Sequence, residues 1–166
     1  TVAIIVARYN SQVTEKLLAG AEQALREAGA EKVDVYTVPG AFDIDAATAA
    51  AWLTQPNVHG DSNARVLRPL RNAKDLTTRP RESWLIDFGR MTQADARLFE
   101  LPFQQVLREV KPVRDGNRDK SRRENWWLHG RTGDDLRQAT AGLPRVVVTP
   151  RVAKYRSFLW VHPRVY

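Results

Sequence analysis

The chain changes character near residue 45, and this change limits what any single fold or function can explain. Residues 1–50 contain 4 Lys and Arg against 7 Asp and Glu, whereas residues 51–166 contain 22 against 12. All five tryptophans lie in the second part. A reversal of charge together with an all-or-none distribution of tryptophan indicates two sequence origins. We therefore interpret the two parts separately.

Length and composition exclude several classes of protein. A chain of 166 residues with 43% hydrophobic content fits one domain or two small ones and is too apolar to be wholly disordered. No apolar run approaches the roughly 18 residues of a membrane span, and no signal peptide is recognisable. The chain has no cysteine, which excludes disulfides and thiolate metal sites. We expect a cytoplasmic protein with no metal site.

The first 38 residues have the pattern of a strand, a helix and a second strand. Val2–Ala7 is a continuous apolar run of the kind buried on both faces of a parallel sheet. Apolar residues then recur at helical spacing from Val13 to Ala28, and Gly29 suits a left-handed helix stop. Val33–Val38 has the pattern of the second strand. We expect an α/β unit of βαβ type with parallel strands, incomplete as a sheet by itself.

Aromatic and polar residues follow the carboxyl ends of both expected strands. Tyr9 follows the first strand, and Ala41, Phe42 and Asp43 follow the second. Ligands of open α/β sheets bind at this edge. The Tyr9 ring has the shape to stack on a flat heterocycle, while backbone amides and the Asp43 carboxylate suit hydroxyl groups. The alternative is that Tyr9 and Phe42 simply pack against a helix.

These turns carry a family resemblance. The chain reads ARYNSQVTEKLLAGAEQALREAGAEKVDVYTVPGAFD over residues 7–43 and resembles the N-terminus of lumazine synthase, a riboflavin-pathway enzyme family. Residues 8–10 match the family's R-[FW]-N turn, and residues 38–43 match its V-P-G-[AS]-[FW]-E turn. The resemblance implies that Tyr9 stacks on the substrate pyrimidine. It also implies that Ala41, Phe42 and Asp43 bind the ribityl chain, although Asp43 is one methylene shorter than the family's Glu.

The later motifs of that family are not found. They are a G-x-T-x-H stretch with a proton-transferring His and an Arg that binds phosphate, whereas His59, His129 and His162 lie in other contexts. Positioning both reactants supplies much of the catalytic advantage of a condensing enzyme. We therefore expect half of a substrate site, with no catalytic residue.

The remainder has an α+β pattern. We expect helices over residues 45–53, 92–99, 103–110 and 134–141, and strands over residues 84–88, 146–149 and 157–161. Residues 54–64 are rich in turn formers and predict a linker. The predicted organisation is an N-terminal unit at 1–43, a helix and linker at 44–64, and an α+β segment at 65–166.

A basic and aromatic stretch offers a candidate nucleic-acid site. Residues 111–127 read KPVRDGNRDKSRRENWW. Cations three to four residues apart line one face of a helix and can follow a phosphate backbone. The candidates for phosphate contact here are Arg118, Arg122 and Arg123. Trp126 and Trp127 either stack on bases or anchor a core. Because acidic residues interleave with the basic ones, a salt-bridged solvated helix is the alternative.

Several blocks of the second part occur in a familiar order. They are N-x-H-G, D-[LIV]-T-x-R-P, W-x-I-D-F-G, [VE]-x-P-x-R-x-x-N-R before W-W, and T-P-x-x-[AS]-K-x-R. With them, residues 42–166 resemble the region that follows the catalytic domain in class I, S-adenosylmethionine-dependent, adenine-type DNA methyltransferases of single-chain restriction–modification systems. The resemblance implies a truncated target-recognition segment that binds duplex DNA. We assign Lys154, which belongs to a second basic cluster, to phosphate contact as well.

The catalytic motifs of these methyltransferases are missing. The F-x-G-x-G loop and the [ND]-P-P-[YF] motif are absent, and base flipping needs both a pocket and a methyl donor. We therefore expect no cofactor on this chain alone, S-adenosylmethionine belonging to a catalytic domain that acts in trans. Residues 41–44 fit both families, as expected for a gene fusion or an assembly artefact. Our leading hypothesis is a DNA-recognition fragment of a methyltransferase without its catalytic domain, and the alternatives are a lumazine-synthase-type fragment and an inactive chimera.

Overall fold

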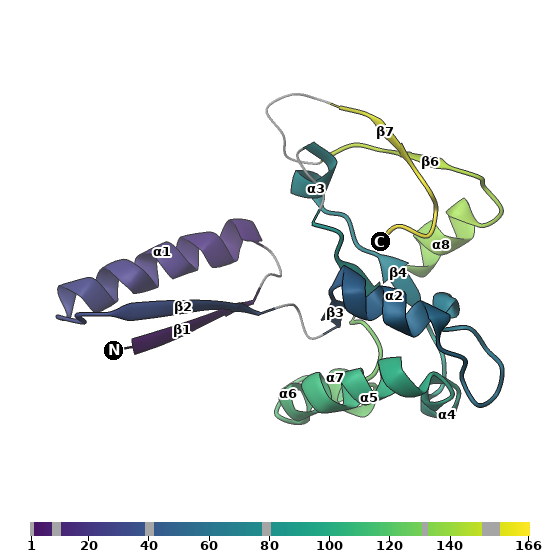
Figure 1. Ribbon diagram of the computed structural model, residues 1–166, viewed down its shortest axis with the longest axis horizontal. Helices are drawn as coiled ribbons and strands as arrows, with labels where there is room; N and C mark the ends of the chain where they lie inside the picture. Colours follow the sequence, from purple (N-terminus) through teal and green to yellow (C-terminus); the bar gives the residue numbers. More distant parts are fainter. Residues whose placement is uncertain (1, 8–10, 39–41, 78–80, 131–132, 151–156) are drawn as a thin grey trace. The chain divides into compact units, whose positions relative to one another are not determined.

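The computed structural model describes residues 2–7, 11–38, 42–77, 81–130, 133–150 and 157–166. The backbone divides between Ala41 and Phe42 into two units, Thr1–Ala41 and Phe42–Tyr166, whose elements are labelled in Figure 1. Among the described residues, no helix combines the length and apolarity that a membrane crossing requires.

The first unit is a strand, a helix and a parallel strand. These elements are β1 (Val2–Ala7), α1 (Ser11–Glu27) and β2 (Val33–Val38). The two strands pair from Val2 with Val33 to Ala7 with Val38. Because the pairing is parallel, both strands end at the same edge of the sheet. The turns that follow them, residues 8–10 and 39–41, lie outside the described residues.

The helix of this unit stops in the way its sequence indicates. Gly29 adopts a φ of +83°, which costs a residue without Cβ little. The amide of Ala30 donates to the Leu25 carbonyl at 2.9 Å and that of Gly29 to the Arg26 carbonyl at 3.0 Å, the two hydrogen bonds of a Schellman stop. Among the side chains described in Thr1–Ala41, none is buried, and Leu17 is 66% exposed. The described side chains of this unit therefore provide little core, as expected of one helix on two strands.

The second unit is organised around a three-stranded antiparallel sheet. Its strands are β3 (Asp43–Ile44), β4 (Leu67–Pro69) and β5 (Trp84–Ile86), with β5 in the centre. The remaining elements are α2 (Ala46–Thr54), the 3-10 helix η1 (Asn63–Arg65), α3 (Ala73–Thr77), α4 (Gln93–Arg97), α5 (Glu100–Glu109), α6 (Lys111–Asp115), α7 (Lys120–Glu124), α8 (Asp134–Thr140), and the antiparallel strands β6 (Val146–Val148) and β7 (Leu159–Val161).

Side-chain caps fix where two of these helices begin. The Asp45 carboxylate accepts the Thr48 amide at 2.7 Å at the start of α2. At the start of α4, the Thr92 hydroxyl oxygen accepts the Asp95 amide at 3.2 Å and its hydrogen is donated to the Asp95 carboxylate at 2.7 Å. These bonds satisfy backbone donors that the first turn of a helix leaves without a partner.

Aromatic side chains join the sheet to the helices. The Phe88 ring, just beyond β5, lies 6.3 Å from the Phe103 ring of α5, centroid to centroid. Phe103 in turn lies 5.4 Å from Trp126, and Trp126 lies 6.0 Å from Trp127 in an edge-on arrangement. All four side chains are buried. The centre of the second unit is therefore an aromatic core between β5 and α5.

Residues 54–64 are not the linker that their turn-forming composition predicts. Asn57 and Asn63 are buried, and the Asn57 side-chain amide donates to the Asn63 side-chain oxygen at 2.9 Å. Asn63 donates in turn to the Trp52 carbonyl of α2 at 2.8 Å. Turn-forming residues here satisfy buried backbone groups inside the second unit, which begins at Phe42 rather than at residue 65.

Candidate functional site

The register of the central sheet places opposite charges on one face. Arg68 of β4 pairs with Leu85 of β5. Side chains two residues apart on a strand point to the same face, so Asp87 lies diagonally opposite Arg68 on that face. Leu85, which shares this face, is 5% exposed, so the face carries Arg68 and Asp87 beside a buried apolar side chain.

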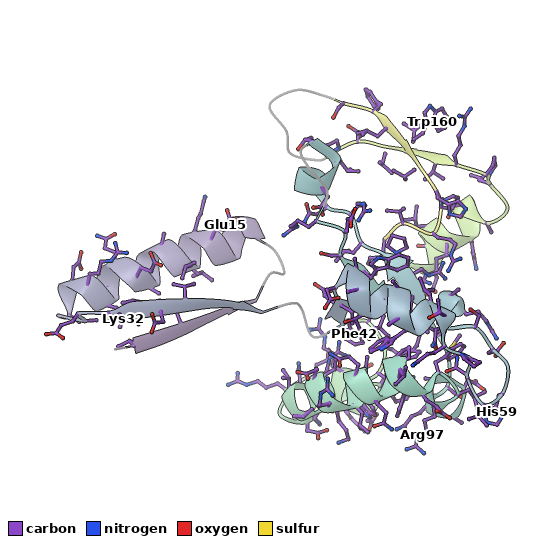
Figure 2. The ribbon with its side chains drawn as sticks, in the orientation of Figure 1. Glu15, Lys32, Phe42, His59, Arg97 and Trp160 are labelled. Carbon is purple, nitrogen blue, oxygen red and sulfur yellow. The ribbon has the colours of Figure 1, made fainter. Side chains whose placement is uncertain are left out.

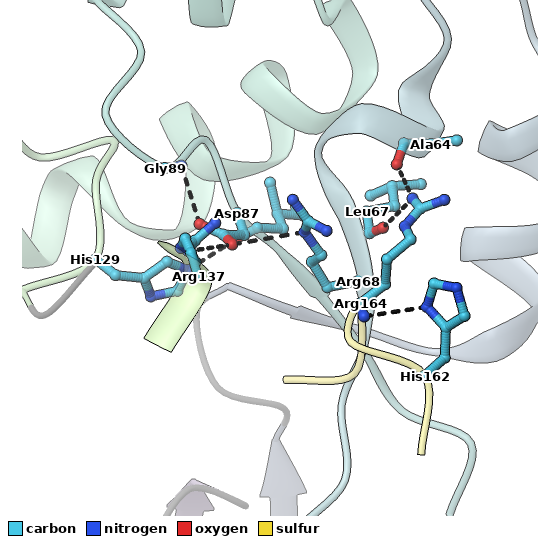
Figure 3. Close-up of polar contacts among 10 residues, drawn as sticks. Ala64, Leu67, Arg68, Asp87, Gly89, His129, Arg137, His162 and Arg164 are labelled. Carbon is cyan, nitrogen blue, oxygen red and sulfur yellow. Dashed lines mark hydrogen bonds and ion pairs between the residues drawn. The ribbon is translucent and has the colours of Figure 1, made fainter. Parts of the chain in front are cut away.

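Asp87 is the centre of the charged group shown in Figure 3. Its carboxylate, 1% exposed, accepts a hydrogen bond from Nη2 of Arg137 at 2.6 Å and from the Gly89 amide at 2.9 Å. The Nε atom of Arg68 lies 3.8 Å from the same carboxylate, an ion pair without a hydrogen bond. A buried carboxylate is stable here because one guanidinium and one amide solvate it.

Arg68 is less well satisfied than Asp87. Burial lowers the pKa of Arg68 from its ordinary value, the nearby charge of Asp87 acts in the opposite direction, and Arg137 and Arg164 lower it further. Its Nε atom is buried and has no hydrogen-bond partner within the described part of the chain. The guanidinium nevertheless stays charged at neutral pH.

A cavity of about 580 Å³ opens beside this group. It is formed by β4, the residue after β5, helix α8 with the turn that follows it, and the segment after β7. Its lining includes Arg68, Asp87, Leu136, Arg137, Leu143 and Arg164. The Arg164 guanidinium donates to the carbonyls of Ala64 and Leu67, as Figure 3 shows. Charged and apolar side chains thus line the same cavity within the second unit.

His129 lies close to the same sheet but is part of the packing. Its Nε2 atom lies 2.8 Å from the Ile86 carbonyl and therefore donates to it. The ring is 4.2 Å from the Phe42 ring and 5.8 Å from the Tyr166 ring, centroid to centroid. Burial lowers the pKa of His129, an effect that its bond to Ile86 opposes. In the described ranges, no group of three or more His, Asp or Glu could hold a metal.

The basic stretch forms two short helices rather than one long cationic face. Arg122 of α7 pairs with Asp119 at 3.4 Å, and both are about half exposed. Arg123 donates from Nη1 to the carbonyls of Asn117 at 2.6 Å and Arg118 at 3.1 Å, so it closes the turn before α7. Arg118 is exposed. Lys154, the fourth predicted phosphate contact, lies outside the described residues.

Trp126 and Trp127 lie in the core. They are 5% and 8% exposed, and the Trp127 indole N–H donates to the Met91 carbonyl at 2.9 Å. Base stacking requires accessible rings, whereas core anchoring requires buried ones. Both rings are buried, which corresponds to core anchoring. Trp160 of β7, in contrast, is 61% exposed (Figure 2), and the Arg145 guanidinium lies 4.3 Å from the centroid of its ring.

The residues predicted to bind a ribityl ligand are divided by the boundary at Ala41. Tyr9 and Ala41 lie outside the described residues. Phe42 is 9% exposed, lies among the side chains of the second unit in Figure 2, and has Arg114 over its ring at 5.6 Å. Asp43 pairs with Leu85 in the sheet. The Phe42 side chain is therefore an anchor of the second core, which leaves it little surface for a ligand.

Sequence reasoning missed the group around Asp87. One signal was present, because Asp87 is a single carboxylate at the end of the apolar run WLIDF. A charge inside a run of this kind is buried only with a partner, but its partners come from β4 and α8, distant in sequence. Nothing in the local sequence marks Arg68 or Arg137 as those partners.

The comparisons with known proteins concern the N-terminal part of the chain. Residues 1–62 match the family model described as 6,7-dimethyl-8-ribityllumazine synthase. The enzyme of this name from Pediococcus pentosaceus is 56% identical over 45 residues, 26% of this chain and 29% of the relative. That from Thermococcus onnurineus is 48% identical over 44 residues, again 26% and 29%. The chain therefore spans less than a third of the length of these relatives.

Two further results limit the comparison. The family model extends beyond the predicted end at Asp43 to residue 62, so it includes α2, whose Ala49 is fully buried in the second unit. No solved structure matches the chain. The predicted resemblance of residues 42–166 to DNA methyltransferases has no counterpart among these matches, and it stays a prediction.

Proposed function

We propose that Thr1–Ala41 is the ligand-holding part of a lumazine-synthase-type protein, and that the chain binds a ribitylaminopyrimidine without condensing it. The observation that carries this proposal is the parallel pairing of Ala7 with Val38. This pairing ends both strands at one edge of the sheet, the edge at which α/β folds bind ligands, and the segments that match the family follow these strand ends in the sequence. The match to lumazine synthases over residues 1–62 supports the same substrate class.

Because the Phe42 side chain is buried in the second unit, it is not among the proposed ligand contacts. Tyr9 stacks on the pyrimidine, and the backbone at Ala41 holds the ribityl hydroxyls, whereas Asp43 belongs to the second unit with Phe42. No proton-transferring His and no phosphate-binding Arg of the family pattern accompany these residues. Because condensation depends on orienting two reactants, binding of one reactant produces no turnover.

Titration calorimetry of the full chain with a ribitylaminopyrimidine tests this function. We expect saturable binding, weakened about tenfold by Tyr9→Ala because stacking on a flat base contributes about 1–3 kcal/mol. Leu17→Ala, an exposed change on α1 of the same unit, is the matched control and should leave the affinity unchanged. Absence of heat from the folded chain, or equal effects of both substitutions, would remove the proposal. Formation of a lumazine would contradict its non-catalytic part.

A second candidate function is duplex DNA binding by Phe42–Tyr166. One observation favours it, since this unit has 22 Lys and Arg against 14 Asp and Glu, and Arg118 and Arg122 are exposed on and beside α7. The proposed contacts go to phosphate, with Lys154 adding another and a methyltransferase catalytic domain acting as partner in trans. Arg123 contributes indirectly, because it holds the turn that carries Arg118.

Filter binding of duplex DNA at several salt concentrations tests the second candidate. The logarithm of the affinity should fall linearly with the logarithm of salt, with a slope of about −0.9 for each phosphate neutralised. Arg118→Ala combined with Arg122→Ala should reduce that slope, whereas Arg108→Ala on α5 should not. Absence of binding at low salt would exclude this function. If neither ligand binds the folded chain, the inactive chimera is the remaining interpretation.

A further inference from the structure

The cavity beside Asp87 has a surplus of positive charge. Three guanidinium groups line it, those of Arg68, Arg137 and Arg164, against the single carboxylate of Asp87. Arg164 donates to backbone carbonyls, and none of the described carboxylate side chains forms an ion pair with it. Two positive charges therefore remain in a partly enclosed space, where electrostatic attraction to an anion is stronger than in bulk water.

One donor in this cavity lacks an acceptor. The Arg68 Nε atom is buried and makes no hydrogen bond within the described residues, although it lies 3.8 Å from the Asp87 carboxylate. Buried polar groups in native proteins are nearly always paired, and guanidinium groups form short, planar hydrogen bonds with oxyanions. The Asp87 carboxylate is already held by Arg137 and Gly89, and Arg68 has no hydrogen-bond acceptor among the described residues, so a ligand in the cavity could supply one.

The rest of the cavity is suited to an apolar group. Leu136, Ala141, Leu143 and Val165 line it together with the arginines. Its volume of about 580 Å³ falls within the range of sites for small organic molecules. Leu136 and Leu143 are exposed, and a ligand in contact with them would cover this apolar surface.

We propose that this cavity binds a small organic phosphomonoester, whose phosphate accepts hydrogen bonds from Arg68 and whose apolar body lies against Leu136 and Leu143. The surplus of two charges favours a phosphate dianion over a carboxylate, which brings only one. Asp87 is the positioning residue of the site, because its carboxylate accepts a hydrogen bond from Arg137 and so orients that guanidinium. The site lies entirely within Phe42–Tyr166, so it is independent of pyrimidine binding by the first unit.

Calorimetric titration of the intact chain at constant ionic strength tests the site with three probes. Phenyl phosphate should bind with one-to-one stoichiometry, and at least about tenfold more tightly than inorganic phosphate, which lacks the apolar body, or benzoate, which lacks the second charge. Arg68→Met removes the charge but keeps the stem, and should weaken phenyl phosphate binding about tenfold or more. Arg108→Met makes the same change on the exposed face of α5 and should leave the affinity within twofold.

A second variant keeps the test decisive if Arg68→Met does not fold. Ala141 lines the cavity but is exposed after α8, so Ala141→Trp fills the space without removing a charge or a core side chain. It should abolish phenyl phosphate binding while near-ultraviolet circular dichroism remains native. The proposal is overturned if phenyl phosphate does not saturate, if benzoate binds as tightly, or if Ala141→Trp still binds.

Discussion

Nη2 of Arg137 lies 2.6 Å from Oδ2 of Asp87, and this contact connects α8 to the end of the central strand across 50 residues of sequence. Helix α8 buries none of its own residues, and its Leu136 is 69% exposed. Apolar packing therefore contributes little to the position of α8. A charge pair with a buried carboxylate holds the helix in place and with it one wall of the cavity.

Asp87→Asn should destabilise the second unit by about 2 kcal/mol, because hydrogen bonds to charged groups contribute about 1.5–3 kcal/mol. Urea unfolding followed by tryptophan fluorescence measures this free energy, and it reports on the second unit alone since all five tryptophans lie there. Asp115→Asn is the control, because its pair with Lys111 is exposed and should contribute about 0.5 kcal/mol or less. Similar losses for both variants would contradict the structural role of Asp87.

Trp127→Phe should cost about 1–2 kcal/mol, because it removes the indole N–H that satisfies the Met91 carbonyl and leaves that acceptor without its partner. Trp160→Phe is the matched change at an exposed position and should cost about 0.5 kcal/mol or less, the contribution of its contact with Arg145. Unfolding in urea compares the two. A smaller cost at Trp127 than at Trp160 would argue that the buried bond contributes nothing.

Local sequence signals predicted many of the elements. The apolar runs at Val2–Ala7 and Val33–Val38 are strands with the predicted bounds, and Gly29 ends α1. The Thr92 side chain caps α4, and the three-residue spacing to Asp95 suffices for this contact. Such signals act within a few residues of the chain. Periodicity and capping therefore sufficed to predict them.

Features that depend on distant residues were not predicted. Strand β4 has only three residues, and its Pro69 reads as a turn former. Residues 54–64 have loop composition, yet Asn57 and Asn63 are buried by partners on α2 and η1. The cavity arises where Arg68 and Asp87 meet α8 and the segment after β7. A pattern within a window of 10–15 residues carries no information about these contacts.

His129→Gln should make the free energy of unfolding fall less steeply as the pH is lowered. Burial lowers the pKa of His129 in the folded state, so below about pH 6.5 the unfolded chain binds a proton that the folded chain excludes. The contribution of neutral His129 is complete above that pH and is lost as the pH falls, with a slope of at most about 1.4 kcal/mol per pH unit. Gln does not titrate but can still donate to the Ile86 carbonyl.

Urea unfolding at pH 7.5, 6.5 and 5.5 measures this difference. The free energy of unfolding of the parent chain should fall more steeply between pH 6.5 and 5.5 than that of His129→Gln. His59→Gln is the control, because His59 is exposed in the turn after α2 and should leave the pH dependence unchanged. Parallel curves for the parent and His129→Gln would show that His129 is protonated equally in both states.

The two units should differ in hydrogen exchange. The amides of β1 and β2 are protected by one parallel pairing, and no described side chain of these strands is buried. In contrast, β4, β5 and α5 contain the fully buried residues Leu67, Ile86 and Val106. Amides of the second group should exchange about a hundredfold or more slowly, because their opening approaches global unfolding. Mass-spectrometric exchange of the intact chain measures both groups at once. Saturating ribitylaminopyrimidine should slow exchange only in β1 and β2. If, without ligand, the amides of β1 and β2 exchanged as slowly as those of β4, β5 and α5, the weak core of the first unit would be contradicted.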